Sequence, residues 1–177
     1  MTETNMTFEE ALRKSEELLL FFSSSSSSSS SSELDAELQK HLNELLSGLA
    51  SSRAFFVTFL AGDNTLADDV PDFILESIKR SSAHAELLSK NLVMSTAMRI
   101  THKRDGDELN AQGSERVARR TTQLIQRLHS SPLRSKLLEM KSSLQSRSGE
   151  FAEFIKRWNY DDEQCLAASK AIESALS

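Results

Sequence analysis

Hydrophobic side chains recur every three or four residues along most of the chain, which is the spacing of one face of an α-helix. The clearest series begins with Leu34, Leu38, Leu42, Leu45 and Leu49. It continues to Phe56 and Leu60. No window shows the two-residue alternation between turns that is typical of strands. The pattern therefore predicts an all-α fold.

The number of such stretches predicts a helical bundle of about six to seven helices. Pro71 suits the first turn of one of them, where its missing N–H costs nothing. That helix, over residues 71–103, has apolar residues on two sides, and Lys90 is the only charge between Leu87 and Met98. Because a helix that is apolar on two sides belongs inside a bundle, we expect residues 71–103 to be its centre.

Polar and glycine residues predict where the helices begin, bend and end. Thr7 and Glu10 have the spacing of a capping box. Gly48 and the pair Ser51–Ser52 are expected to bend the long helix that follows the serines. Further ends are predicted at Gly62, Asp105-Gly106-Asp107, Ser131-Pro132, Gly149 and Asp161-Asp162. The last helix carries the apolar residues Leu166, Ile172 and Leu176.

Ten consecutive serines divide the chain. They occupy residues 23–32 and separate an N-terminal helix over residues 1–22 from a bundle domain over residues 33–177. Such a tract cannot bury apolar surface, so we interpret it as a linker, or as an artefact in which serine stands in for other residues.

Composition narrows the class of protein. The chain has 25 Leu against 6 Ile and 4 Val, with two Pro and five Gly, a bias towards helix formers. Cys165 is the single cysteine, which excludes an intramolecular disulfide and a cysteine-based zinc site. No apolar stretch reaches the roughly 20 residues of a membrane span. We therefore expect a cytoplasmic protein without a membrane span.

Charge is distributed unevenly along the chain. Residues 1–98 have net charge −8, residues 99–147 have +6 and the remainder has −3. Within the basic block, Arg116, Arg120 and Arg127 fall on one stripe of a predicted helix over residues 107–129. With Arg119, they form the predicted interaction surface. A row of arginines can also track phosphates, so nucleic-acid binding is an alternative, although no aromatic residue lies between Phe73 and Phe151 to stack on bases.

Other chemistry has weaker signals. Glu37, His41 and Glu44 share one helical face and could ligate a metal, but HExxH and ExxH patterns are absent. Cys165 lies in the first turn of a helix beside three acidic residues, which oppose thiolate formation, so we expect it to face the core. Phe151, Phe154 and Trp158, with Tyr160 nearby, are expected to pack in the core rather than anchor a partner.

No glycine-rich phosphate loop and no G-x-S-x-G occurs. We therefore predict no catalytic residues, no bound metal and no cofactor. The leading hypothesis is a non-enzymatic helical protein-interaction module, such as an adaptor, an assembly factor or a regulatory factor, whose partner is another protein or a second copy of itself. A metal-dependent or otherwise unrecognised helical enzyme is the remaining alternative.

Overall fold

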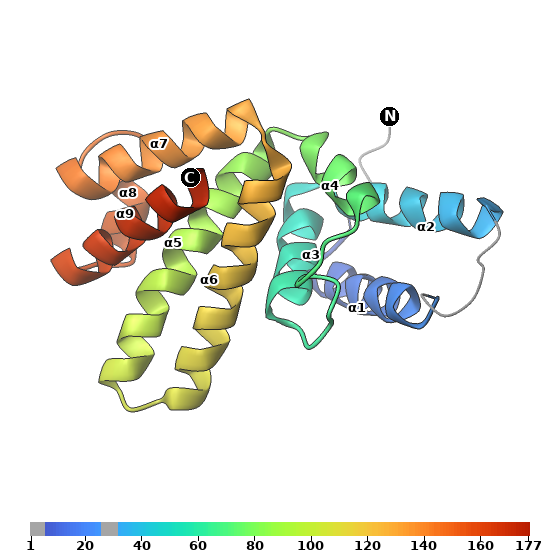
Figure 1. The fold of residues 1–177 in the computed structure, drawn as a ribbon, viewed down its shortest axis with the longest axis horizontal. Coiled ribbons are helices and arrows are strands. Elements are labelled where there is room, and N and C mark those ends of the chain that lie inside the picture. Colours follow the sequence, from blue (N-terminus) through green and yellow to red (C-terminus); the bar gives the residue numbers. More distant parts are fainter. Residues whose placement is uncertain (1–5, 26–31) are drawn as a thin grey trace. The chain divides into compact units, whose positions relative to one another are not determined.

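Helices make up all the regular structure that is described. The computed structural model describes residues 6–25 and 32–177, and this part of the chain forms nine α-helices (Figure 1). The predicted all-α class is therefore confirmed. The helices are α1 (Phe8–Ser25), α2 (Ser32–Leu45), α3 (Leu49–Ala61), α4 (Asp72–Lys79), α5 (Ala83–Arg104), α6 (Glu108–Leu128), α7 (Ser131–Ser146), α8 (Ala152–Arg157) and α9 (Asp162–Leu176).

The chain divides into two compact units, each contiguous in sequence. The N-terminal unit is residues 1–83 and the C-terminal unit is residues 84–177. Within the N-terminal unit, α1 packs against α3, so it is part of this unit's core. The central part of the predicted serine linker, residues 26–31, lies outside the described residues. The predicted start of a domain at residue 33 stays a prediction.

Aromatic rings fill the core of the N-terminal unit. Phe55, Phe56 and Phe59 on α3 are completely buried. The rings of Phe55 and Phe59 stack with their centroids 5.3 Å apart and an interplanar angle of 14°. The capping box predicted at the start of α1 is present: the Thr7 N–H donates to a Glu10 carboxylate oxygen at 3.0 Å, and the Glu10 N–H donates to the Thr7 hydroxyl at 3.2 Å.

The predicted bend at Gly48 is a sharp break between α2 and α3. The two helices lie at 113° to one another. Ser47 ends α2 by donating its hydroxyl hydrogen to the Glu44 carbonyl at 2.7 Å, and Gly48 is the N-cap of α3 in an extended conformation. In the described ranges, no single helix is long and apolar enough to span a bilayer; α2 and α3 meet that test only as a bent pair.

The single central helix predicted over residues 71–103 is instead two helices, α4 and α5. Residues 80–82 separate them. The Ser81 hydroxyl accepts a hydrogen bond from the Ala83 N–H at 3.3 Å, so a side chain takes the place of the backbone carbonyl that this N–H would bond in a continuous helix. The two halves of the predicted helix therefore belong to different cores, with Ile74 buried in the N-terminal unit and Leu92 buried in the C-terminal unit.

In the C-terminal unit, α5 and α6 form an antiparallel pair (Figure 1). Gly106 permits the tight turn between them because its φ is 71°, in the left-handed region. Helix α9 packs on α6 and α7. Helix α7 ends at Ser146, earlier than the predicted Gly149, because Arg147 already adopts the left-handed conformation and its N–H bonds back to the Ser143 carbonyl.

Gln164 joins α9 to α5. It completes the capping box with Asp161 at the start of α9. Its side-chain amide also donates to the Ala97 carbonyl at 3.1 Å and to the Thr101 hydroxyl at 2.9 Å, both on α5. One buried side chain therefore both caps α9 and fixes its position against α5.

We expect Gln164→Ala to lower the free energy of unfolding by about 1–3 kcal/mol, because it removes a helix cap and leaves the Ala97 carbonyl without its extra donor. Chemical denaturation followed by circular dichroism measures the change. Gln145→Ala on α7 is the matched control, since Gln145 is exposed. Equal stabilities of the two variants would contradict this role.

Candidate interaction surface

A groove runs between the C-terminal half of α5 and the first turns of α9. Its volume is about 520 Å³. Helix α5 contributes Arg99, Ile100, Lys103 and Arg104, and helix α9 contributes Glu163, Leu166, Ala167 and Lys170. Both sets recur at helical spacing, so each wall of the groove is one face of one helix. We call this feature the α5–α9 groove.

Apolar side chains lie in the middle of the groove. Leu166 is 57% exposed, and Ile100 and Ala167 are half-buried. A single exposed leucine is ordinary on a protein surface. Here, however, the leucine adjoins two further apolar side chains within a concave surface, the arrangement found at binding sites.

Four basic side chains surround the apolar part, and two of them are neutralised. Arg104 bonds to Asp161 at 2.5 Å and also to Glu163, and its guanidinium lowers the pKa of the Asp161 carboxyl. Arg99 bonds to Glu115 at 3.1 Å. The side chains of Lys103 and Lys170 form no hydrogen bond or ion pair within residues 6–25 and 32–177. Among the described residues, the unpaired cations of the groove are therefore these two lysines, one on each wall, and with the second carboxylate on Arg104 counted the net charge is one positive.

Leu166 lies on the exposed side of α9. The buried residues of α9 include Cys165, Ala168 and Ile172, which share a face, whereas Leu166 points away from them. At 100° per residue, Leu166 and Ile172 are separated by 120° around the helix. Leu166 is therefore on a different face of α9 from the buried residues.

The predicted arginine surface on α6 is not one uniformly exposed row. Arg119 is exposed, Arg116 and Arg127 are half-buried, and Arg120 is only 3% exposed. Arg119 donates to the Gln123 side chain at 3.3 Å, and none of the four arginines is without partners. A contact role for Arg116, Arg119, Arg120 and Arg127 stays a prediction.

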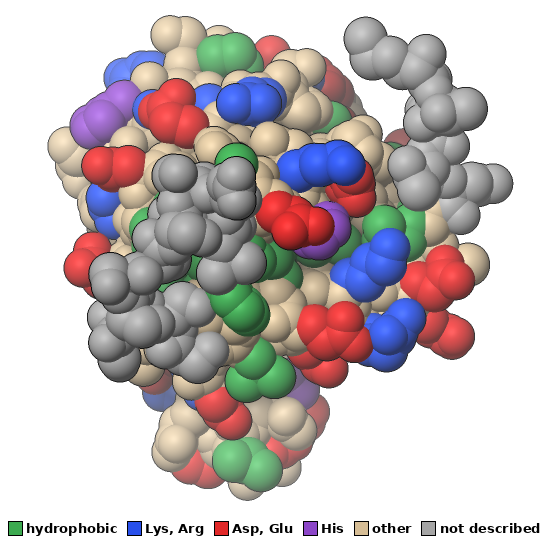
Figure 2. Space-filling model, turned by 90° about the vertical axis from the view of Figure 1, so that its right-hand side faces the viewer, with side chains coloured by type: hydrophobic (Ala, Val, Ile, Leu, Met, Phe, Trp, Pro, Cys, Tyr) green, Lys and Arg blue, Asp and Glu red, His purple; other side chains and the backbone are tan. Residues whose placement is uncertain are grey.

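The two units differ in the sign of their charge. The N-terminal unit has 6 Lys and Arg against 14 Asp and Glu, net −8, and the C-terminal unit has 15 against 12, net +3. On the face drawn in Figure 2, acidic and basic side chains are interspersed rather than segregated, with hydrophobic side chains between them. Among the residues drawn in colour on that face, the basic side chains form no continuous stripe.

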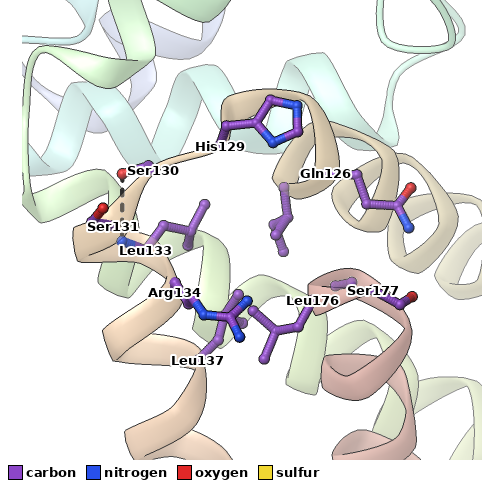
Figure 3. A pocket seen from close by; sticks show the side chains of 11 residues that line it. Gln126, His129, Ser130, Ser131, Leu133, Arg134, Leu137, Leu176 and Ser177 are labelled. Atoms are coloured by element: carbon purple, nitrogen blue, oxygen red, sulfur yellow. Dashed lines mark hydrogen bonds between the residues drawn. The ribbon is translucent and has the colours of Figure 1, made fainter.

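A second hollow lies between α6, α7 and the end of α9, with a volume of about 410 Å³. Leu133 and Arg134 point into it from α7, and Leu176 from α9 (Figure 3). Ser130, the N-cap of α7, also lines the hollow, and its hydroxyl accepts a hydrogen bond from the Leu133 N–H at 3.4 Å. His129 also lines the hollow and is exposed. The residues present supply no paired nucleophile and base.

Across the described ranges, no three His, Cys, Asp or Glu side chains come together in a way that could hold a metal ion, and this includes Glu37, His41 and Glu44.

The aromatic residues after α7 are only partly in the core. Phe151 and Tyr160 are buried as predicted, but Trp158 is 45% exposed because it follows the end of α8. Burial raises the pKa of the Tyr160 hydroxyl, which has no hydrogen-bond partner within the described residues.

Cys165 faces the interior, as expected from the sequence, and is 5% exposed. Burial raises the pKa of its thiol; Arg147 acts in the opposite direction, and Asp162 and Asp161 reinforce the effect of burial. A raised pKa leaves less thiolate at neutral pH, and thiolate is the reactive form. The residue therefore lacks the environment of a catalytic cysteine.

We expect Cys165 to react with a chromogenic disulfide reagent at pH 7.5 at least about tenfold more slowly than an exposed thiol, and its rate to keep rising above pH 9. The control is the double variant Cys165→Ser/Ser135→Cys, which places one thiol on the exposed side of α7. Similar rates for the two thiols at pH 7.5 would show that Cys165 is accessible and ionised.

These features define the class: an all-α protein of two helical units with a mixed apolar and basic groove on the second. The family model described as "Uncharacterised conserved protein UCP020893" matches residues 7–175, so the chain belongs to this family. No curated protein and no solved structure gives a significant match. The family match covers both units, including every residue of the α5–α9 groove.

Proposed function

We propose that the chain is a non-enzymatic helical protein-interaction module that acts in the cytoplasm as an adaptor, an assembly factor or a regulatory factor. The observation that supports this proposal is the α5–α9 groove, where Leu166 remains 57% exposed beside Ile100 and Ala167. Fully burying an exposed leucine side chain contributes about 1.5–3 kcal/mol. Leu166 still has 57% of its surface in water to contribute. A partner that covers this groove would therefore gain binding energy from it.

The test is affinity capture of partners by the tagged full chain from native lysate, with and without nuclease, followed by mass spectrometry. Protein partners that survive nuclease treatment would support the interaction module. Loss of all partners on nuclease treatment would favour the nucleic-acid alternative, and binding that weakens steeply with salt would accompany it. Turnover of a small molecule by the purified chain would overturn the non-enzymatic assignment.

A further inference from the structure

We infer that the α5–α9 groove binds an acidic amphipathic helix of a partner protein. In this arrangement, Leu166 contacts the apolar stripe of that helix, and Lys103 and Lys170 pair with its carboxylates. The inference rests on the proposed interaction function and adds to it the chemistry of the partner and the residues that select it.

The shape of the groove suits a short helical segment. Its α9 wall extends from Glu163 to Lys170, which is about 10 Å along the helix axis at 1.5 Å per residue. Two turns of a partner helix cover that distance. An amphipathic helix in a groove is recognised through apolar anchors spaced three and four residues apart, and the groove offers Leu166, Ile100 and Ala167 to receive them.

The charges of the groove favour a partner helix that is negatively charged. Glu115, Asp161 and Glu163 pair with Arg99 and Arg104, and these three carboxylates exceed the two guanidiniums by one negative charge. With Lys103 and Lys170 added, the balance is one positive charge. Lys170 lies near enough to Glu173 to lower the pKa of that carboxyl, but Lys141 supplies the larger effect through an ion pair at 2.8 Å. Lys103 and Lys170 thus retain charge to offer a partner. A basic helix would be repelled by them.

The groove fits a polyanionic backbone less well than an acidic helix. A nucleic acid would present phosphates to the two lysines but would leave the apolar part, centred on Leu166, without an apolar partner. An acidic amphipathic helix complements both parts at once, since one of its faces is apolar and its flanks carry carboxylates.

Selection from a displayed peptide library tests the inference. The library consists of peptides of about 16 residues with leucines fixed on one helical face and Glu, Lys, Gln or Ala at the other positions; this length exceeds the groove. The targets are the full chain and, for counter-selection, its Leu166→Glu variant. We expect enrichment of glutamate beside the leucine stripe among peptides that bind only the unaltered chain.

Titration of a selected peptide against variants then locates the site. We expect Lys103→Glu/Lys170→Glu and Leu166→Glu each to weaken binding at least about tenfold, and added salt to weaken it further. The matched control is Lys40→Glu/Lys156→Glu, which makes the same charge change at two exposed lysines elsewhere. Circular dichroism confirms that each variant keeps its helices, as expected for substitutions at exposed positions.

Four results would overturn the inference, three of them from the peptide experiments. Those three are enrichment of lysine-rich peptides, failure to select any peptide over the Leu166→Glu target, and binding that the groove variants leave unchanged. Self-association that Leu166→Glu abolishes in sedimentation would also overturn it, since a second copy would then occupy the groove. If lysate partners persist on the groove variants, the interaction function stands and only the assignment to this groove fails.

Discussion

Replacement of Phe59 with alanine is expected to lower the free energy of unfolding of the N-terminal unit by about 3–5 kcal/mol. Phe59 is completely buried, and its ring stacks on Phe55 at 5.3 Å. The substitution removes both the apolar contact area and the ring contact, and it leaves a cavity in the core beside α3, the helix that packs against α1. A loss of this size is comparable with the whole stability of a small unit.

Urea denaturation followed by circular dichroism measures this loss, and hydrogen exchange assigns it to α1–α4. Val57→Ala is the control on the same helix, because Val57 is 50% exposed, and it should cost less than about 1 kcal/mol. If Phe59→Ala lowered the free energy of unfolding no more than Val57→Ala, the description of a buried aromatic core in this unit would be wrong.

Replacement of Leu124 with alanine is expected to cost about 2–5 kcal/mol in the C-terminal unit. Leu124 is completely buried on α6, the helix on which α9 packs. The chain has one tryptophan, Trp158, which lies in this unit, so its fluorescence reports unfolding here. The expected result is a shift of the fluorescence transition to lower denaturant concentration.

The control for this prediction is Leu109→Ala, which makes the same chemical change on the same helix at a residue that is 81% exposed. Its free energy of unfolding should stay within about 0.5 kcal/mol of that of the unaltered chain. Equal losses from Leu124→Ala and Leu109→Ala would mean that α6 does not bury the face described here.

Local features of the fold were predictable from the sequence. The capping residues Thr7 and Asp161, the bend at Gly48 and the turn around Gly106 depend on residues a few positions apart, and all are present. The division at residues 80–82 was not predicted. An unbroken apolar pattern does not show whether its two halves pack against the same neighbours, and here Ile74 and Leu92 lie in different units.

The candidate site could not be predicted in the same way. Its two walls are more than 50 positions apart in the sequence, and only the packing of α9 on the C-terminal unit brings them together. The arginines of α6 show the opposite difficulty. Their spacing places them on one stripe, yet Arg120 is 3% exposed, because position on a helical stripe does not reveal what covers that stripe.

The contiguity of the two units has a consequence for synthesis on the ribosome. Neither unit requires a segment from the other end of the chain, since one ends at Ala83 and the other begins at His84. Domains generally fold as units while the polypeptide emerges, with the first one leading. The acidic unit can therefore enclose Phe55 and Phe59 while the ribosome is still translating the groove. Fifteen of the 21 lysine and arginine residues belong to the unit that is translated second.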